Sequence, residues 1–211
     1  MMHILIADDH AVVRKGLKQL LLEEYPASTI EEVGDGQAII SKVIHEKWDV
    51  VICDIDMPGR SGLDAMRQIK GIDPKLPVLI MSIYPEEQYA VRVLKAGAAG
   101  YVCKDTATEE LVKAVQMVLQ GRKYISPSMA EMIAEDIGGQ YDLEKASHES
   151  LSDREFEVFK LIASGKSVSE IAEKLSLGST TVSTHRARIL VKMNMRTNPE
   201  LTRYALDNKL I

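Results

Sequence analysis

The sequence is poor in cysteine and contains no long apolar run. Its two cysteines, Cys53 and Cys103, each lie inside a short apolar run and not at metal-ligand spacing. We therefore expect two small buried side chains, and neither a zinc site nor a disulfide. No apolar run approaches the roughly 18 residues that span a bilayer, and the first residues lack the basic and apolar segments of a cleavable leader. These absences predict a cytoplasmic protein with no membrane partner.

Charge is distributed unevenly along the chain. The net charge of -5 argues against a nucleic-acid partner when it is taken alone. Residues 1–124 hold 15 basic and 18 acidic residues, residues 125–150 hold 1 and 6, and residues 151–211 hold 10 and 7. Only the last segment is basic, as a module that contacts phosphates would be, although an excess of this size is modest evidence.

Residues 1–124 alternate short apolar runs with helical patterns, which predicts an α/β domain. Five βα units with continuously apolar strands indicate a parallel five-stranded sheet covered on both faces, and we expect the flavodoxin-like strand order 2-1-3-4-5. The predicted strands are 4–7, 30–33, 50–53, 78–81 and 101–103, and the predicted helices are 12–24, 36–46, 62–71, 86–96 and 108–120.

The rest of the chain divides into a linker and a second domain. Residues 125–150 are acidic and lose the alternating pattern, so we predict a linker there, with a possible short helix at 127–137 that Gly138-Gly139 would end. Residues 151–211 predict a small all-α domain whose first helix starts at Ser152, because Glu155 follows at capping-box spacing. Its helices are predicted near 153–164, 168–174, 179–193 and 198–207.

Four of the predicted strands run into residues that carry chemistry. Asp8 and Asp9 follow the first strand, Asp54 follows the third, Ser82 the fourth and Lys104 the fifth. Each residue alone has an ordinary explanation as a helix cap, a solvated side chain or a turn residue. The carboxyl ends of parallel strands lie at one edge of the sheet, so we expect these side chains to converge in one shallow crevice.

The expected crevice suits phosphoryl chemistry on a carboxylate. Three carboxylates that lie together repel one another and need a cation, and Mg²⁺ fits because it prefers hard oxygen ligands. With Mg²⁺ and the Lys104 ammonium neutralising an incoming phosphoryl group, Asp54 can act as nucleophile and form an aspartyl phosphate. Ser82 would donate a hydrogen bond to a phosphoryl oxygen.

Residues 3–120 resemble a response-regulator receiver domain. The resemblance implies direct Mg²⁺ coordination by Asp9 and Asp54, help from Asp8 through water, a ligand from the backbone carbonyl of Asp56, and a role for Tyr101 as an aromatic switch. It also implies a sensor histidine kinase as partner. Ser82 stands where the family often has threonine, which keeps the hydroxyl. The matching motifs are Asp8-Asp9, Asp54-Ile55-Asp56-Met57-Pro58-Gly59 with Gly62, Ser82, Ala96-Gly97-Ala98, Gly100-Tyr101 and Lys104.

Residues 168–193 predict a helix-turn-helix. Ile171, Ala172 and Leu175 form an apolar stripe on one helix, a turn follows at 177–179, and the next helix turns Val182, Ile189 and Met193 toward the core. The outward face of that helix is small and suits the major groove. We expect Ser183, Thr184 and Ala187 to face base edges, and Arg186, Arg188, Lys192 and the helix start at Ser179, Thr180 and Thr181 to meet phosphates.

Residues 151–211 are similar to LuxR-type helix-turn-helix domains, and a receiver joined to such a domain is the layout of the NarL/FixJ response regulators. The resemblance implies binding to promoter DNA as a homodimer when phosphorylated. In this family the last helix pairs two effector domains, which would place Leu201, Tyr204 and Ala205 at a dimer contact. The alternative is that this helix only closes the domain's core.

The leading hypothesis is a two-component regulator in which phosphorylation on Asp54 controls dimerisation and sequence-specific DNA binding. It would not be a turnover enzyme, although self-dephosphorylation is expected. A rival hypothesis is a magnesium-dependent α/β phosphohydrolase that uses Asp54 as nucleophile, but it leaves the second domain unexplained. Another hypothesis is a degenerate receiver that binds proteins independently of phosphate. The intact set of acidic, hydroxyl and lysine residues at the strand ends argues against it.

Overall fold

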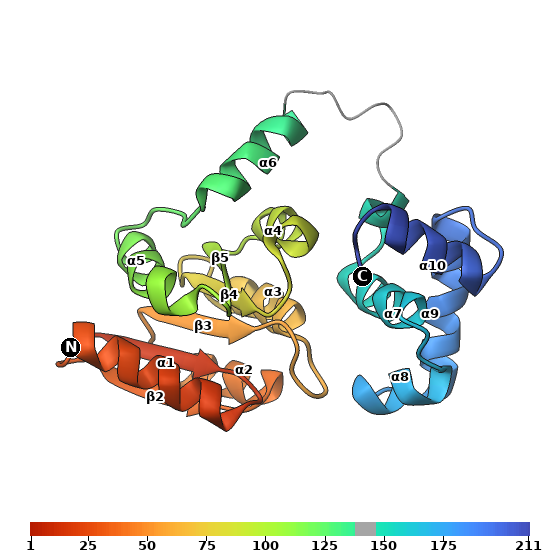
Figure 1. Ribbon diagram of the computed structural model, residues 1–211. Helices are drawn as coiled ribbons and strands as arrows, with labels where there is room; N and C mark the ends of the chain where they lie inside the picture. The colour runs from red at the N-terminus through yellow and green to blue at the C-terminus, as the bar shows by residue number, and fades with distance from the viewer. Residues whose placement is uncertain (138–146) are drawn as a thin grey trace. The chain divides into compact units, whose positions relative to one another are not determined.

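The computed structural model describes residues 1–137 and 147–211, which form two compact units divided between Ala134 and Glu135 (Figure 1). That division falls inside the predicted linker. The pair Gly138-Gly139, predicted to end a helix, lies outside the described residues. In the part of the chain that is described, no helix combines the length and the apolarity needed to cross a membrane.

The first unit is a parallel sheet with strand order β2-β1-β3-β4-β5, which confirms the flavodoxin-like prediction. Helices α1 and α5 pack against each other over one face of the sheet, and α2 and α3 pack together over the other. The elements are β1 (His3–Ala7), α1 (Ala11–Glu24), β2 (Thr29–Val33), α2 (Gly36–His45), β3 (Val50–Asp54), α3 (Gly62–Ile72), β4 (Val78–Ser82), α4 (Glu86–Lys95), β5 (Gly100–Cys103) and α5 (Ala107–Leu119).

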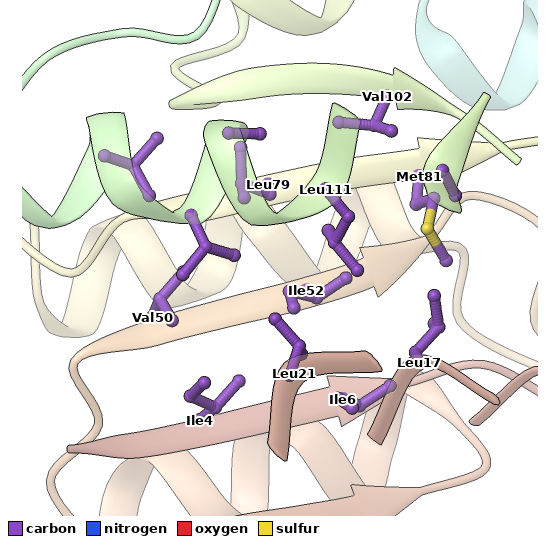
Figure 2. Close-up of a cluster of buried hydrophobic side chains, with 14 of the residues drawn as sticks. Ile4, Ile6, Leu17, Leu21, Val50, Ile52, Leu79, Met81, Val102 and Leu111 are labelled. Atoms are coloured by element: carbon purple, nitrogen blue, oxygen red, sulfur yellow. The ribbon is translucent and has the colours of Figure 1, made fainter. Parts of the chain in front are cut away.

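Alternate strand residues build the core beneath α1 and α5. Ile4 pairs with Val50 in register and Ile52 pairs with Leu79, so their side chains line the same face of the sheet. Leu17 and Leu21 of α1 and Leu111 of α5 close over them (Figure 2). The intervening strand residues are also buried, which is why the strands are apolar throughout. This rigid sheet fixes the positions of the residues at its carboxyl edge.

The cysteines differ in their surroundings. Cys53 lies in the central strand β3 and is fully buried, as predicted. Cys103 was also predicted to be buried, but it is only partly buried because it is the last residue of the edge strand β5.

A helix at the start of the predicted linker belongs to the first unit. Helix α6 (Pro127–Ile137) begins with proline, which suits the first turn because its missing N–H has no helical partner there. Ser126 and Met129 are buried, and Ser126 donates a hydrogen bond to the Glu86 carboxylate at 2.6 Å. The first unit therefore includes the first part of the segment that the sequence assigned to the linker.

The second unit is all α, as predicted. Helix α7 contacts α8, α9 and α10, and the core includes Phe156, Phe159 and Ile162. Ser152 starts α7 with the predicted capping box, and Ser167 starts α8 with a second one that we did not predict. The elements are a 3-10 turn (Ser147–Ser150), α7 (Asp153–Ala163), α8 (Val168–Lys174), α9 (Ser179–Lys192) and α10 (Asn198–Asp207).

Candidate functional site

The carboxyl edge of the sheet brings an acid from two strands and a lysine from a third into contact. Asp8 follows β1, Asp54 ends β3 and Lys104 follows β5. The Lys104 Nζ lies 2.5 Å from Asp54 Oδ2 and 2.6 Å from Asp8 Oδ2. Although Asp54 and Lys104 are 50 residues apart, the strand order places them side by side. The convergence expected from the sequence is therefore present for these three residues.

Burial controls the ionisation of this group. Asp54 is only 2% exposed, and loss of water raises its pKa to about 6 even though Lys104 acts in the opposite direction. Burial also works to lower the pKa of Lys104, but the hydrogen bonds and charges of Asp54 and Asp8 outweigh it, so the pKa is raised. The lysine therefore stays cationic, while the buried Asp54 carboxylate is destabilised in its charged form.

The acidic side chains fit a divalent cation. Asp8, Asp9, His10 and Asp54 each offer a donor atom within 4.8 Å of the others. The Oδ2 atom of Asp8 is buried and accepts no hydrogen bond of good geometry, although the Lys104 ammonium lies within ion-pair distance. The clustered carboxylate oxygens are the hard donors that Mg²⁺ prefers, and Lys104 already balances part of their negative charge. His10 was not predicted here, although it directly follows the acidic pair.

A tyrosine that the sequence did not single out lies at the rim of the site. The Tyr84 hydroxyl donates a hydrogen bond to Asp56 Oδ2 at 2.8 Å, and the Asp56 N–H donates to Asp54 Oδ1 at 3.4 Å. The Tyr84 ring stacks on Tyr89 with ring centroids 5.0 Å apart. Tyr84 and Asp56 are 28 positions apart in the sequence, which explains why no sequence pattern revealed the contact. The Asp56 carbonyl as a metal ligand stays a prediction.

Ser82 and Tyr101 lie on neighbouring strands behind the carboxylates. The Ser82 Oγ accepts a hydrogen bond from the Tyr84 N–H at 3.2 Å, and the Tyr101 hydroxyl donates to the Tyr84 carbonyl at 2.6 Å. Burial raises the pKa of Tyr101, while a hydrogen bond with Ser82 acts in the opposite direction. Both residues therefore contact the start of the β4–α4 loop. The Tyr101 ring is fully buried, so it is in an inward position, and its role as a switch stays a prediction.

Helices α8 and α9 form the predicted helix-turn-helix. Val182 and Ile189 of α9 are fully buried and Met193 nearly so, while the opposite face is open to solvent. Ser176, in the turn, adopts a left-handed backbone with φ 52. Of the predicted DNA contacts, Arg186 is partly buried and donates a hydrogen bond to Asn198 Oδ1 at 2.8 Å. The exposed ones are Ser179, Thr180, Thr181, Ser183, Thr184, Ala187, Arg188 and Lys192.

Lys192 also has a partner inside the domain. Its Nζ lies 2.6 Å from Glu155 Oε2, the carboxylate that completes the Ser152 capping box. Burial works to raise the pKa of Glu155, but the hydrogen bonds from Lys192 and Ser152 outweigh it and lower the pKa. This ion pair joins the end of α9 to the start of α7. Helix α9 is thereby held to the domain core at its last turn.

The residues predicted for dimerisation lie mainly in the core of the second unit. Leu201 and Ala205 are fully buried, so their side chains are not available to a second copy in this structure. Tyr204 is partly exposed, and its hydroxyl lies 2.8 Å from His148 Nδ1. The alternative that α10 closes the core therefore accounts for these contacts. A dimer contact through α10 stays a prediction.

Both units match known families. Residues 4–116 match the family described as "Response regulator receiver domain", and residues 149–205 match "Bacterial regulatory proteins, luxR family". The chain is a response regulator with a LuxR-type DNA-binding domain. Curated relatives match over the whole chain. "Oxygen regulatory protein NreC" of Staphylococcus epidermidis is 38% identical over 100% of this chain and 99% of that protein, and its counterpart in Staphylococcus carnosus is also 38% identical.

Solved structures of response regulators share this architecture. RcsB of Salmonella enterica serovar Typhimurium, "bound to promoter rprA in the presence of phosphomimetic BeF3-", is 26% identical and covers 97% of this chain and 98% of its own, with a TM-score of 0.64. A LuxR-family response regulator from Aurantimonas sp. SI85-9A1 is 33% identical, with a TM-score of 0.59, and covers 64% of this chain and 97% of its own. This chain therefore has the receiver fold and the helical DNA-binding domain of LuxR-type response regulators.

Proposed function

We propose that this response regulator accepts a phosphoryl group on Asp54 from a sensor histidine kinase and that phosphorylation strengthens promoter binding. One observation carries the proposal: the Lys104 ammonium lies within 2.6 Å of two buried carboxylates, Asp8 and Asp54, from separate strands. Burying charges costs free energy of desolvation, so a buried cluster of this kind indicates a functional site. The arrangement is suited to a phosphoryl group, which brings negative charge and needs a nearby cation.

The transfer uses Asp54 as the nucleophile. One of its carboxylate oxygens attacks phosphorus, the bond from phosphorus to the donor's histidine nitrogen breaks, and an acyl phosphate forms. Mg²⁺, when bound by Asp9, Asp54 and the Asp56 carbonyl with help from Asp8, supplies positive charge to the phosphoryl oxygens. Lys104 pairs with another phosphoryl oxygen and Ser82 donates a hydrogen bond to a third. Attack of water on the phosphorus of the acyl phosphate later releases inorganic phosphate and restores the Asp54 carboxylate.

The new contacts change the β4–α4 loop. In this structure the Ser82 Oγ accepts a hydrogen bond from the Tyr84 N–H, and Tyr101 donates to the Tyr84 carbonyl. Drawing Ser82 toward the phosphoryl group alters both contacts, so Tyr101 and the start of α4 move to a second arrangement. We propose that this arrangement favours a homodimer, in which two α9 helices read two half-sites of promoter DNA. A solved structure of the related RcsB, described as two dimers bound to two parallel DNAs, supports this proposal.

The experiment compares the full chain with and without beryllofluoride, which mimics the phosphoryl group. We expect the mass in solution to change from monomer to dimer and the affinity for promoter DNA to rise at least tenfold, since a dimer binds both half-sites together. Light scattering and DNA binding titrations at fixed salt measure both quantities. Unchanged mass and affinity would exclude the gating. Rapid turnover of an external phosphoester would instead support the hydrolase.

A second prediction distinguishes a basic side chain of α9 that meets phosphate from one that is already paired with a carboxylate of its own domain. Arg188 is exposed and predicted to meet phosphate, so Arg188→Met should lower the slope of log affinity against log salt by about one. Lys192→Met should lower the slope by less, because Glu155 already neutralises part of its charge. Glu155→Gln should increase the contribution of Lys192. Equal slope changes at Arg188 and Lys192 would show that the Glu155 pair breaks when DNA binds.

A further inference from the structure

A carboxylate at the start of α4 is bonded to the first turn of α6. The Glu86 Oε2 atom accepts hydrogen bonds from the hydroxyl of Ser126, at 2.6 Å, and from the hydroxyl of Ser128. Ser126 directly precedes α6, and its Oγ accepts a hydrogen bond from the Met129 N–H at 3.1 Å. The Ser126 hydroxyl therefore caps α6 and also connects it to α4. The Glu86 charge is favoured there because it lies close to the N-terminal ends of both helices.

The chain is fixed to the first unit as far as this turn of α6. The Tyr124 N–H donates a hydrogen bond to the Ala99 carbonyl at 2.8 Å, beside the edge strand β5. Met129 is fully buried. The exposed residues that follow it are Ala130, Glu131 and Ala134. The attachment of α6 therefore depends largely on the contacts of its first turn, which include both hydrogen bonds to Glu86.

Glu86 also follows closely on the loop residue that contacts Ser82 and Tyr101. The Tyr84 N–H donates to Ser82 Oγ, and the Tyr84 carbonyl accepts a hydrogen bond from Tyr101. Only Pro85 separates Tyr84 from Glu86, and the proline ring fixes one of the two backbone rotations between them. A displacement of the Tyr84 peptide is therefore passed on to Glu86. Hydrogen bonds weaken steeply as their geometry departs from the ideal, so a small movement of this carboxylate loosens α6.

We propose that Glu86, Ser126 and Ser128 form a latch that holds α6 while Asp54 is unphosphorylated and that opens when the β4–α4 loop rearranges. This proposal rests on the proposed function in one respect, which is that phosphorylation of Asp54 displaces this loop. A contact that is made in only one of two arrangements stabilises that arrangement, and its removal shifts the equilibrium toward the other. The latch therefore opposes the release of α6, the helix from which the chain continues toward the DNA-binding unit.

The alternative is that these three side chains only stabilise the start of α6. In that case the contact has the same strength in both arrangements of the loop. Removing it would loosen α6 equally with and without a phosphoryl group, and the affinity for a phosphoryl mimic would not change. A latch that opens on phosphorylation predicts instead that its removal makes the mimic bind more tightly, because binding and opening are linked.

The test uses the full chain, two latch variants and a matched control for each. Glu86→Ala removes the acceptor and Ser128→Ala removes one donor, whereas Ser126 is left in place because it also caps α6. Glu109→Ala is the control for the acid, since Glu109 is exposed in the first turn of α5. Ser41→Ala is the control for the hydroxyl, since Ser41 is exposed on α2.

Amide hydrogen exchange of residues 130–134, followed by mass spectrometry, reports the attachment of α6. In Mg²⁺ buffer, beryllofluoride should speed this exchange roughly tenfold in the unaltered chain, as expected when hydrogen bonds to a carboxylate are lost. Both latch variants should exchange roughly tenfold faster without beryllofluoride and respond less than about twofold when it is added. Fluorine NMR should show that they bind beryllofluoride at roughly three- to tenfold lower concentration. Both controls should match the unaltered chain.

The outcomes separate the latch from the proposed function. Unchanged exchange in both latch variants, or faster exchange with an unchanged affinity for beryllofluoride, would overturn the latch. If the unaltered chain binds beryllofluoride but its residues 130–134 exchange at a constant rate, the latch is wrong and phosphorylation of Asp54 still stands. If the unaltered chain binds no beryllofluoride, both proposals fail.

Discussion

Asparagine in place of Asp54 is expected to abolish phosphoryl labelling of the chain and to stabilise the receiver in metal-free buffer. The labelling is lost because an amide cannot form the acyl phosphate. The stability rises because burial disfavours the Asp54 carboxylate, whose pKa is raised to about 6. Asparagine has nearly the same shape without that charge. We expect a gain on the order of 2 kcal/mol at pH 8 from a pKa difference of about two units.

The pH dependence of this gain has a definite sign. The folded chain holds a proton on Asp54 up to about pH 6, whereas the unfolded chain releases it near pH 4. The contribution of Asp54 to the stability of the unaltered chain therefore falls as pH rises from about 4 to 6, and the advantage of Asp54→Asn is complete only above this window. Urea unfolding at several pH values, without metal, measures the difference. A constant gain at all pH values, or a loss at pH 8, would contradict it.

A surface substitution controls for the change of charge. Asp105 is exposed and lies next to Lys104 in the sequence, so Asp105→Asn removes one carboxylate close to the site without removing a buried one. The Asp105→Asn chain should accept the phosphoryl label as the unaltered chain does, and its free energy of unfolding should stay within about 0.5 kcal/mol of the unaltered value. Adding Mg²⁺ should narrow the difference between Asp54→Asn and the unaltered chain, because the bound cation compensates the buried carboxylates.

Gly62→Ala is expected to destabilise the receiver by about 3 kcal/mol or more. A Cβ at this position would lie 1.8 Å from the backbone oxygen of Asp54 and 3.0 Å from Cys53 Sγ. Neither group can move easily, because Asp54 is in the central strand β3 and the Gly62 N–H donates to the Ile55 carbonyl at 2.9 Å. The substitution should also displace Asp54 and slow labelling.

Gly16→Ala is the matched control for this glycine. Gly16 lies inside α1, is exposed, and has no atom within 4 Å of its expected Cβ. The same substitution should stabilise the receiver there, by up to about 1 kcal/mol, because alanine favours the helix. The single tryptophan, Trp48, is buried in the receiver, so its fluorescence reports unfolding of this unit alone. A Gly62→Ala chain as stable as the unaltered one would refute the steric argument.

The sequence was informative where local pattern decides structure. The continuous apolar strands at Val50–Asp54 and Val78–Ser82 were recognisable because both of their faces are buried. The capping box at Ser152 was visible as a spacing of three residues, and the one at Ser167 has the same spacing and could have been found. Site residues at the strand ends followed from the parallel topology alone.

Contacts between residues far apart in the sequence could not be predicted from local pattern. The hydrogen bond from Tyr84 to Asp56 and the ion pair of Lys192 with Glu155 join residues that no periodicity relates. The helical wheel placed the apolar side of α9 correctly, but the prediction for α10 assigned Leu201 and Ala205 to a dimer contact, although both are buried in their own domain. A helix with one apolar stripe does not reveal whether that stripe meets its own core or a partner.

Sequence alone determined the order of strands and helices, the acidic, hydroxyl and lysine residues at the sheet edge, and the helix-turn-helix, because these depend on residue spacing along the chain. Tertiary structure decided which charges lie together. The pKa of Asp54, the placement of His10 against Asp9 and the pairing of Lys192 all depend on burial and on distances of a few ångströms between segments far apart in the chain. Electrostatic energies change steeply over such distances, and only folding sets them.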